Sequence, residues 1–137
     1  MKQFCTELKF KTDKIKELIN ITSKIESFVG KNDIKEGLCI VFSLHATGAI
    51  IINENESYLK EDFFENIERI LPRDSAYKHN INDNNAASHI ATSIFSPSQT
   101  LIIDKGKLQK GTWQDIFFLE LDGPRKERKI KIKIIGE

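Results

Sequence analysis

The chain has 137 residues, of which 39% are hydrophobic and 30% are charged, and its 21 Lys and Arg nearly balance its 20 Asp and Glu. This length fits one domain spanning residues 1–137, and the balanced charge argues against a nucleic-acid-binding protein, which usually carries a basic surplus. Cys5 and Cys39 are too few and too far apart for a disulfide framework or a sulfur-rich zinc site. No apolar run is long enough for a membrane span, and no leader segment precedes the first strand, so we expect a cytoplasmic protein.

Periodicity predicts the elements of the first half of the chain. Side chains that alternate between apolar and polar indicate strands, and apolar side chains every three or four residues indicate helices. On this basis we expect, in order, a strand over 3–11, a helix within 12–30, buried strands over 38–44 and 49–52, and a helix over 57–71.

The second half begins with a polar stretch, which predicts a loop. The expected elements are a loop over 72–85, a short helix over 85–95, and strands over 100–103, 113–121 and 129–135. The last strand has the clearest period, because isoleucines alternate with lysines along it. Strands outnumber helices and do not alternate regularly with them, which predicts an α+β fold with a β-sandwich-like core of mostly antiparallel strands and about three helices.

Any imidazole chemistry must come from three residues, because His45, His79 and His89 are the only histidines in the chain. They fall at a strand end, in a loop and in a short helix, which are places where ligands converge on a rigid scaffold. Three imidazoles with an open fourth position form a known catalytic zinc arrangement. The spacing of the three does not match a metal-binding signature, however, and spacing alone favours three independent histidines.

Two carboxylates are candidates for proton transfer or for orienting a metal-bound imidazole. Glu54 comes two residues after the strand expected over 49–52, and Asp83 lies six residues before His89. A turn or helix-cap role for Asp83 is the alternative.

Two further polar side chains are candidates for substrate contacts. The amide of Gln114 would orient a substrate or simply pair with backbone. Arg125 follows a Gly-Pro turn and would bind a phosphate, but the pattern favours an arginine that ties the turn to Asp122 or Glu120.

Several motifs follow one another along the chain. They are His45-Ala-Thr-Gly-Ala49, Ile52-Asn-Glu54, Leu71-Pro72, Tyr77-Lys-His79, Asp83-Asn-Asn85-Ala86 with His89, Gly106-Lys-Leu, Gly111-Thr-Trp-Gln114 and Asp122-Gly-Pro-Arg125. In this order they resemble the YjbQ-like family, an uncharacterised protein family whose members are often named secondary thiamine-phosphate synthases. The resemblance covers nearly the whole chain. Arg128 falls one residue later than the second arginine of the family motif, so we expect no site role for it.

The resemblance implies a YjbQ-like fold that is usually assembled as a homotrimer. It also implies a divalent metal, commonly zinc, and a role for each motif residue. The implied metal ligands are His45, His79 and His89, the catalytic candidates are Glu54 and Asp83, and the substrate-binding candidates are Asn85, Gln114 and Arg125.

The activity implied by the resemblance is thiamine-phosphate synthesis, in which a pyrimidine methyl diphosphate joins a thiazole phosphate and pyrophosphate is released. Magnesium would serve that reaction, yet three imidazoles favour softer metals such as zinc. The alternatives are therefore a zinc-dependent hydrolase or lyase of a small molecule, or a non-catalytic trimer that binds a metal or a ligand. Both enzyme hypotheses require a small-molecule substrate, which is phosphorylated in the synthase hypothesis. None of the hypotheses includes a nucleic acid or a membrane as a partner.

Overall fold

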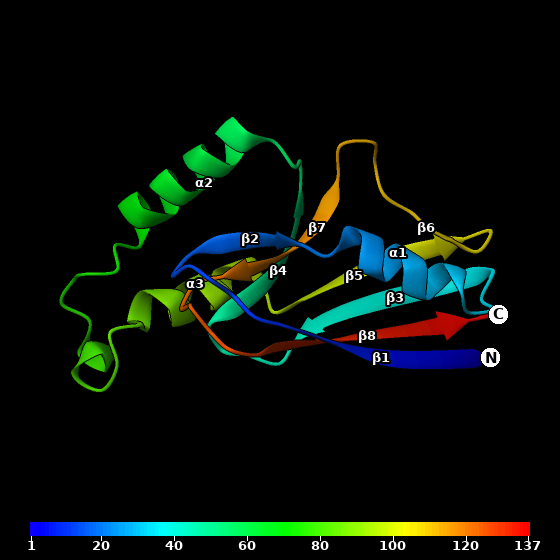
Figure 1. Cartoon of the computed structure of the whole chain (residues 1–137), viewed down its shortest axis with the longest axis horizontal. Helices are drawn as coiled ribbons and strands as arrows, with labels where there is room; N and C mark the ends of the chain where they lie inside the picture. The colour runs from blue at the N-terminus through cyan, green and yellow to red at the C-terminus, as the bar shows by residue number, and fades with distance from the viewer.

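The computed structural model describes all 137 residues and has two antiparallel sheets and three α-helices (Figure 1). The strands are β1 (Lys2–Phe10), β2 (Glu17–Asn20), β3 (Glu36–Ser43), β4 (Gly48–Asn53), β5 (Ser98–Asp104), β6 (Lys107–Leu108), β7 (Asp115–Glu120) and β8 (Arg128–Gly136). The helices are α1 (Thr22–Gly30), α2 (Ser57–Ile70) and α3 (Ala86–Phe95), with a short 3₁₀ helix η1 (Lys78–Ile81) before α3. The expected α+β class is confirmed, and no helix is both long and apolar enough to cross a bilayer.

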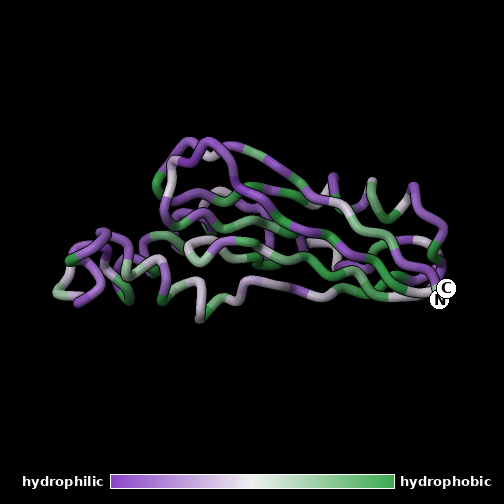
Figure 2. Tube along the Cα trace, turned by 90° about the horizontal axis from the view of Figure 1, so that it is seen from below, coloured by the Kyte–Doolittle hydropathy of each residue, from purple (hydrophilic) through white to green (hydrophobic).

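The larger sheet has the strand order β1-β8-β3-β5-β6 and the smaller sheet β2-β7-β4. The main core lies between these sheets and α1, and the fully buried side chains of Ile130, Ile132 and Ile134 contribute to it from β8. The lysines between these isoleucines point to solvent, so hydropathy alternates along the strand (Figure 2). This alternation is the one that the sequence predicts.

The helix expected within residues 12–30 is wrong in its first half. Glu17–Asn20 forms β2, and only Thr22–Gly30 is helical. β2 pairs antiparallel with β7, with Leu18 opposite Leu119. A strand followed directly by a helix places apolar residues at spacings that resemble one helical stripe, and the pairing with a distant strand decides the outcome.

The other expected elements are confirmed, with ends that differ by at most two residues. The expected loop over 72–85 holds η1, and the two-residue β6 was not predicted. β6 forms a hairpin with β5 through Gly106, whose φ of 76° is in the left-handed region that favours glycine.

β4 and β7 give the smaller sheet two distinct ends. Gly48 lies opposite Glu120 at one end, and Asn53 lies opposite Asp115 at the other. We call the first the histidine end; it comprises the Gly48–Glu120 pair and the neighbouring segments 44–47, 73–92 and 121–129. We call the second the glutamate end; it comprises the Asn53–Asp115 pair with Glu54 and Gln114. At about 3.4 Å per residue, the strands hold the two ends roughly 17 Å apart.

Candidate functional site

His45 has a defined tautomer because of a backbone hydrogen bond. It lies in the loop between β3 and β4, and the backbone N–H of Lys129 donates to His45 Nε2 at 2.8 Å. A backbone N–H can only donate, so Nε2 must carry a lone pair and the neutral ring must carry its proton on Nδ1. Burial, assisted by the charge of Arg128, lowers the pKa of His45 from 6.5, which favours this neutral form.

His79 and His89 form a close pair. Their ring centroids are 4.9 Å apart in an edge-to-face arrangement. His79 comes from η1 and His89 from the first turn of α3, so the pairing depends on the short turn between these two helices. His79 Nε2 lies 3.1 Å from Asn85 Oδ1, whereas the hydrogen bonds of the chain leave both ring nitrogens of His89 free.

A chain of hydrogen bonds fixes the tautomer of His79. Asn85 Nδ2 donates to Asp122 Oδ2 at 2.9 Å, and since a carboxylate only accepts, the amide nitrogen must face Asp122. Asn85 Oδ1 therefore faces His79, and His79 Nε2–H must donate to it. This leaves the lone pair of Nδ1 on His79 free when the ring is neutral. A metal-bound histidine is commonly oriented in this way by its second nitrogen.

Two arginines hold the same aspartate. Arg125 Nη2 donates to Asp122 Oδ2 at 2.8 Å and its Nε donates to the Asp122 carbonyl at 3.0 Å. Arg73 Nη2 contacts Asp122 Oδ1 at 3.4 Å. The tie between Arg125 and Asp122 that the sequence pattern favours is thus present. The Arg125 side chain is nevertheless 48% exposed, so its Nη1 can still meet an anion from solvent.

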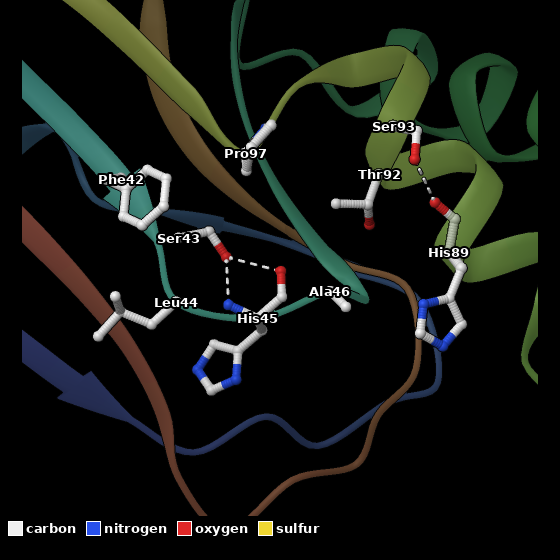
Figure 3. A pocket seen from close by; sticks show the side chains of 9 residues that line it. All are labelled: Phe42, Ser43, Leu44, His45, Ala46, His89, Thr92, Ser93 and Pro97. Carbon is white, nitrogen blue, oxygen red and sulfur yellow. Dashed lines mark hydrogen bonds between the residues drawn. The ribbon is translucent and has the colours of Figure 1, made fainter.

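A pocket of about 440 Å³ separates His45 from His89 (Figure 3). Its lining is formed by Phe42, Ser43, Leu44, His45, Ala46, His89, Thr92, Ser93 and Pro97. Thr92 on α3 is 5% exposed, and its hydroxyl has no hydrogen-bond partner in the chain. Figure 3 shows this hydroxyl facing the space between Ala46 and His89. A buried hydroxyl without a partner is costly, so a ligand or water in this pocket would satisfy it.

A second pocket, of about 600 Å³, opens beside His79 and His89. It is lined by Ala76, Tyr77, Lys78, His79, Ala86, His89 and Ile90. His89 therefore contributes to two pockets, one that it shares with His45 and one that it shares with His79 and Lys78.

The structure does not bring Glu54 and Gln114 to the histidines. Both are exposed residues of the glutamate end, and Gln114 Oε1 accepts the backbone N–H of Gly111 at 2.7 Å. Asp83 lies closer, in the exposed turn between η1 and α3, where its backbone carbonyl accepts from the Asn85 N–H. Its carboxylate makes no hydrogen bond within the chain.

The three imidazoles do not form a common ligand set in this arrangement. No group of three or more His, Cys, Asp or Glu side chains is placed to hold a metal ion. His79 Nδ1 and the nitrogens of His89 are free to bind one, but His45 Nε2 already accepts from Lys129. Two of the three imidazoles therefore fit a metal, and His45 does not while its hydrogen bond stands.

The sequence reasoning missed a buried ion pair beside these residues. Glu120 is 0% exposed and Arg128 is 3% exposed, and Arg128 Nε donates to Glu120 Oε2 at 2.7 Å while its Nη2 donates to Oε1. One feature of the sequence could have revealed it. Arg128 shares the even positions of β8 with the buried isoleucines, and an inward-facing charge requires a buried partner.

Comparison with known proteins gives a consistent result over the whole chain. The family model described as UPF0047 protein YjbQ-like matches residues 6–137. A UPF0047 protein of Methanothermobacter thermautotrophicus is 43% identical over 137 residues, covering 100% of this chain and 95% of that protein. The UPF0047 protein YugU of Bacillus subtilis is 36% identical, covering 94% and 97%. The crystal structure of a YbjQ-like protein of unknown function from Sulfolobus solfataricus has a TM-score of 0.97 at 39% identity, covering 99% of both chains.

Proposed function

The chain belongs to the UPF0047 (YjbQ-like) family, and on this premise we propose that its histidine end binds a divalent metal ion together with a small phosphorylated molecule. One observation carries the proposal: the chain of hydrogen bonds from Asp122 through Asn85 to His79 leaves an unprotonated Nδ1 beside the free ring of His89. Two oriented imidazoles with open positions around them are a suitable start for a metal site that also admits a substrate.

His79 and His89 would hold the ion in this proposal. Imidazole nitrogen favours zinc, copper, iron or nickel over magnesium. A bound ion of this kind would polarise a substrate oxygen or lower the pKa of a bound water. His45 would contribute differently, because its Nδ1–H is a hydrogen-bond donor for the bound molecule rather than a metal ligand.

The phosphate would lie toward the cationic side of the site. Asp122 holds Nε and Nη2 of Arg125, which orients the guanidinium and leaves Nη1 free for an anion. Lys78 adds a second positive charge in the wall of the pocket that contains His79. The uncharged part of the molecule would occupy the pocket between His45 and His89, where Thr92 offers its unpaired hydroxyl.

Thiamine-phosphate synthesis is the specific reaction that the family resemblance puts forward for testing. Arg125 and Lys78 would stabilise the negative charge of the departing pyrophosphate, and Asn85 would keep His79 in place. A zinc-type hydrolase or lyase is the second candidate, favoured by the His79–His89 pair because imidazole ligands suit zinc better than magnesium. Asp83 is the nearer of the two candidate bases, since Glu54 would reach a histidine end only from another copy of the chain in the expected homotrimer.

Metal analysis of protein without a histidine tag tests the ligand assignment. We expect wild type and His45→Ala to retain the metal and His79→Ala and His89→Ala to lose it. Loss in all three variants would instead support the three-imidazole set implied by the resemblance. Equal metal content in every variant would contradict both arrangements.

A parallel assay separates the two reactions. Wild type and His89→Ala would be compared for thiamine phosphate formation and for hydrolysis of a panel of phosphoesters and lactones. If wild type forms thiamine phosphate no faster than His89→Ala, the synthase hypothesis is excluded. Hydrolysis that depends on His89 supports the second candidate.

A further inference from the structure

We propose that the buried Glu120–Arg128 ion pair is a positioning element that sets the tautomers of His45 and His79 together. The functional role of this positioning rests on the proposed function, because His45 and His79 are the two rings that would meet the bound molecule. The inference itself concerns the free protein, however, so it can be tested without a metal or a substrate.

The ion pair is hydrogen-bonded to the backbone as well as within itself. Both side chains are almost completely buried, and Glu120 accepts two hydrogen bonds from the guanidinium and two from backbone N–H groups. Replacing a buried ion pair by apolar residues is often neutral or stabilising, so a buried pair is weak evidence for stability. The role of the pair therefore follows from the segments that Glu120 and Arg128 contact.

Arg128 controls the surroundings of His45 from two sides. Its Nη2 donates to Thr47 Oγ1 at 3.1 Å and contacts the Thr47 carbonyl at 3.4 Å, which fixes the loop that carries the ring. The next residue along β8, Lys129, supplies the backbone N–H that donates to His45 Nε2. The guanidinium thus holds both the imidazole loop and the strand that determines its tautomer.

Glu120 controls the surroundings of His79 through the turn that follows β7. Its Oε1 accepts the backbone N–H groups of Leu121 at 3.1 Å and of Asp122 at 2.9 Å. Asp122 in turn holds Asn85, and Asn85 holds the ring. Ser88 on α3 donates to the Leu121 carbonyl at 2.5 Å, so the helix that carries His89 is anchored to the same turn.

The two sets of contacts meet in a single bidentate contact in the core. A displacement of the carboxylate would move the Asp122 turn, and it would also release the guanidinium that holds Thr47. If the pair were only a core contact, each ring would keep the tautomer set by its own local hydrogen bond. The coupling of the two rings is therefore the property to measure.

Long-range ¹H–¹⁵N NMR of the metal-free protein at pH 7.5 reads the tautomer of each ring. In wild type we expect a single Nδ1–H tautomer for His45 and a single Nε2–H tautomer for His79. In Glu120→Gln and in Arg128→Lys we expect both rings to lose their single tautomer. The matched control is Asp115→Asn, which removes the charge of the Lys110–Asp115 ion pair at the opposite end of β7 and should leave both rings unchanged.

Two results would overturn the inference. One is a folded Glu120→Gln protein in which both tautomers persist, and the other is a change confined in each variant to the nearer ring. If a variant does not fold, Glu120→Asp provides the test, because it keeps the charge but shortens the side chain that holds both Arg128 and the Asp122 turn. Persistence of both tautomers in folded Glu120→Asp contradicts the inference, and loss of both supports it. Since no metal or phosphate is added, failure of the proposed function would not alter these results.

Discussion

The histidine end and the glutamate end of the smaller sheet are built on the same two strands but in different ways. At the histidine end, the buried side chains of Glu120 and Arg128 are bonded to each other, and Glu120 also accepts the backbone N–H of Asp122. At the glutamate end, Glu54 is exposed and Gln114 is bonded only to a backbone N–H three residues earlier. The histidine end therefore has buried charged side chains fixed before a ligand binds, which is what a functional site requires, whereas the polar side chains of the glutamate end are exposed or partly exposed.

The largest expected difference between the two ends is in stability. Arg128→Ala leaves Glu120 as an uncompensated buried charge, so we expect the free energy of unfolding to fall by about 3–5 kcal/mol. Asp115→Asn at the glutamate end should cost only about 0–1 kcal/mol, because the Lys110–Asp115 pair is partly exposed. Urea unfolding at pH 7 measures both. Equal losses in the two variants would remove the distinction between the ends.

The next effect concerns the amide side chains. Asn85→Ala removes the hydrogen bonds to His79 and Asp122, and we expect the free energy of unfolding to fall by about 1–3 kcal/mol. Loss of an outer partner of a metal ligand typically lowers metal affinity by about 10–100-fold. Gln114→Ala, the matched change at the glutamate end, should leave zinc affinity unchanged. Competition titration with a zinc indicator measures both affinities, and an unaltered affinity in Asn85→Ala would speak against His79 as a ligand.

A smaller effect should appear in the pH dependence of stability. The pKa of His45 lies below 6.5 in the folded chain because of burial. As the pH falls below 6.5, the unfolded chain takes up the proton first, so the contribution of this ring is complete above 6.5 and is lost on acidification. We therefore expect His45→Asn to lose less stability than wild type between pH 7.5 and 5.5. Glu54→Gln should show the same decrease in the free energy of unfolding on acidification as wild type. If the free energy of unfolding had the same pH dependence in all three proteins, the assignment of a neutral His45 ring would be contradicted.

The smallest expected effect distinguishes two buried threonines within the histidine end. Thr92→Val removes a hydroxyl without a partner, so stability should change by less than about 0.5 kcal/mol or rise slightly. Thr47→Val removes a hydroxyl bonded to Arg128 and should cost about 1–2 kcal/mol. Thermal and urea unfolding compare them directly. A cost for Thr92→Val as large as that for Thr47→Val would show that the Thr92 hydroxyl has a partner in the free protein.

The sequence predicts elements best where one side of a strand is buried throughout. β8 is an example, because Ile130, Ile132 and Ile134 all point into the core and the period is unbroken. β2 is the opposite case, since its four residues become a strand only by pairing with β7 nearly a hundred residues later. Local periodicity holds no information about such a partner.

The candidate site could be predicted in part. The sequence places His45 before β4 and Glu54 after it, and the continuous strand between them keeps the two side chains apart. The pairing of His79 with His89 depends on the turn between η1 and α3. The tautomer of His45 depends on a backbone group 84 residues away. Neither of these relations can be inferred from the spacing of the residues in the sequence.

The register of β1 against β8 has a practical consequence for engineering. Lys2 lies opposite Gly136, and the amino group of Met1 is 3.0 Å from a carboxylate oxygen of Glu137, so residues 1 and 137 lie side by side (Figure 1). At about 3.4 Å per residue, β8 holds this point roughly 27 Å from Arg128. A short linker between these residues, with a new break in the exposed loop before Gln114, would give a circular permutant whose fused or immobilised ends lie away from the histidines.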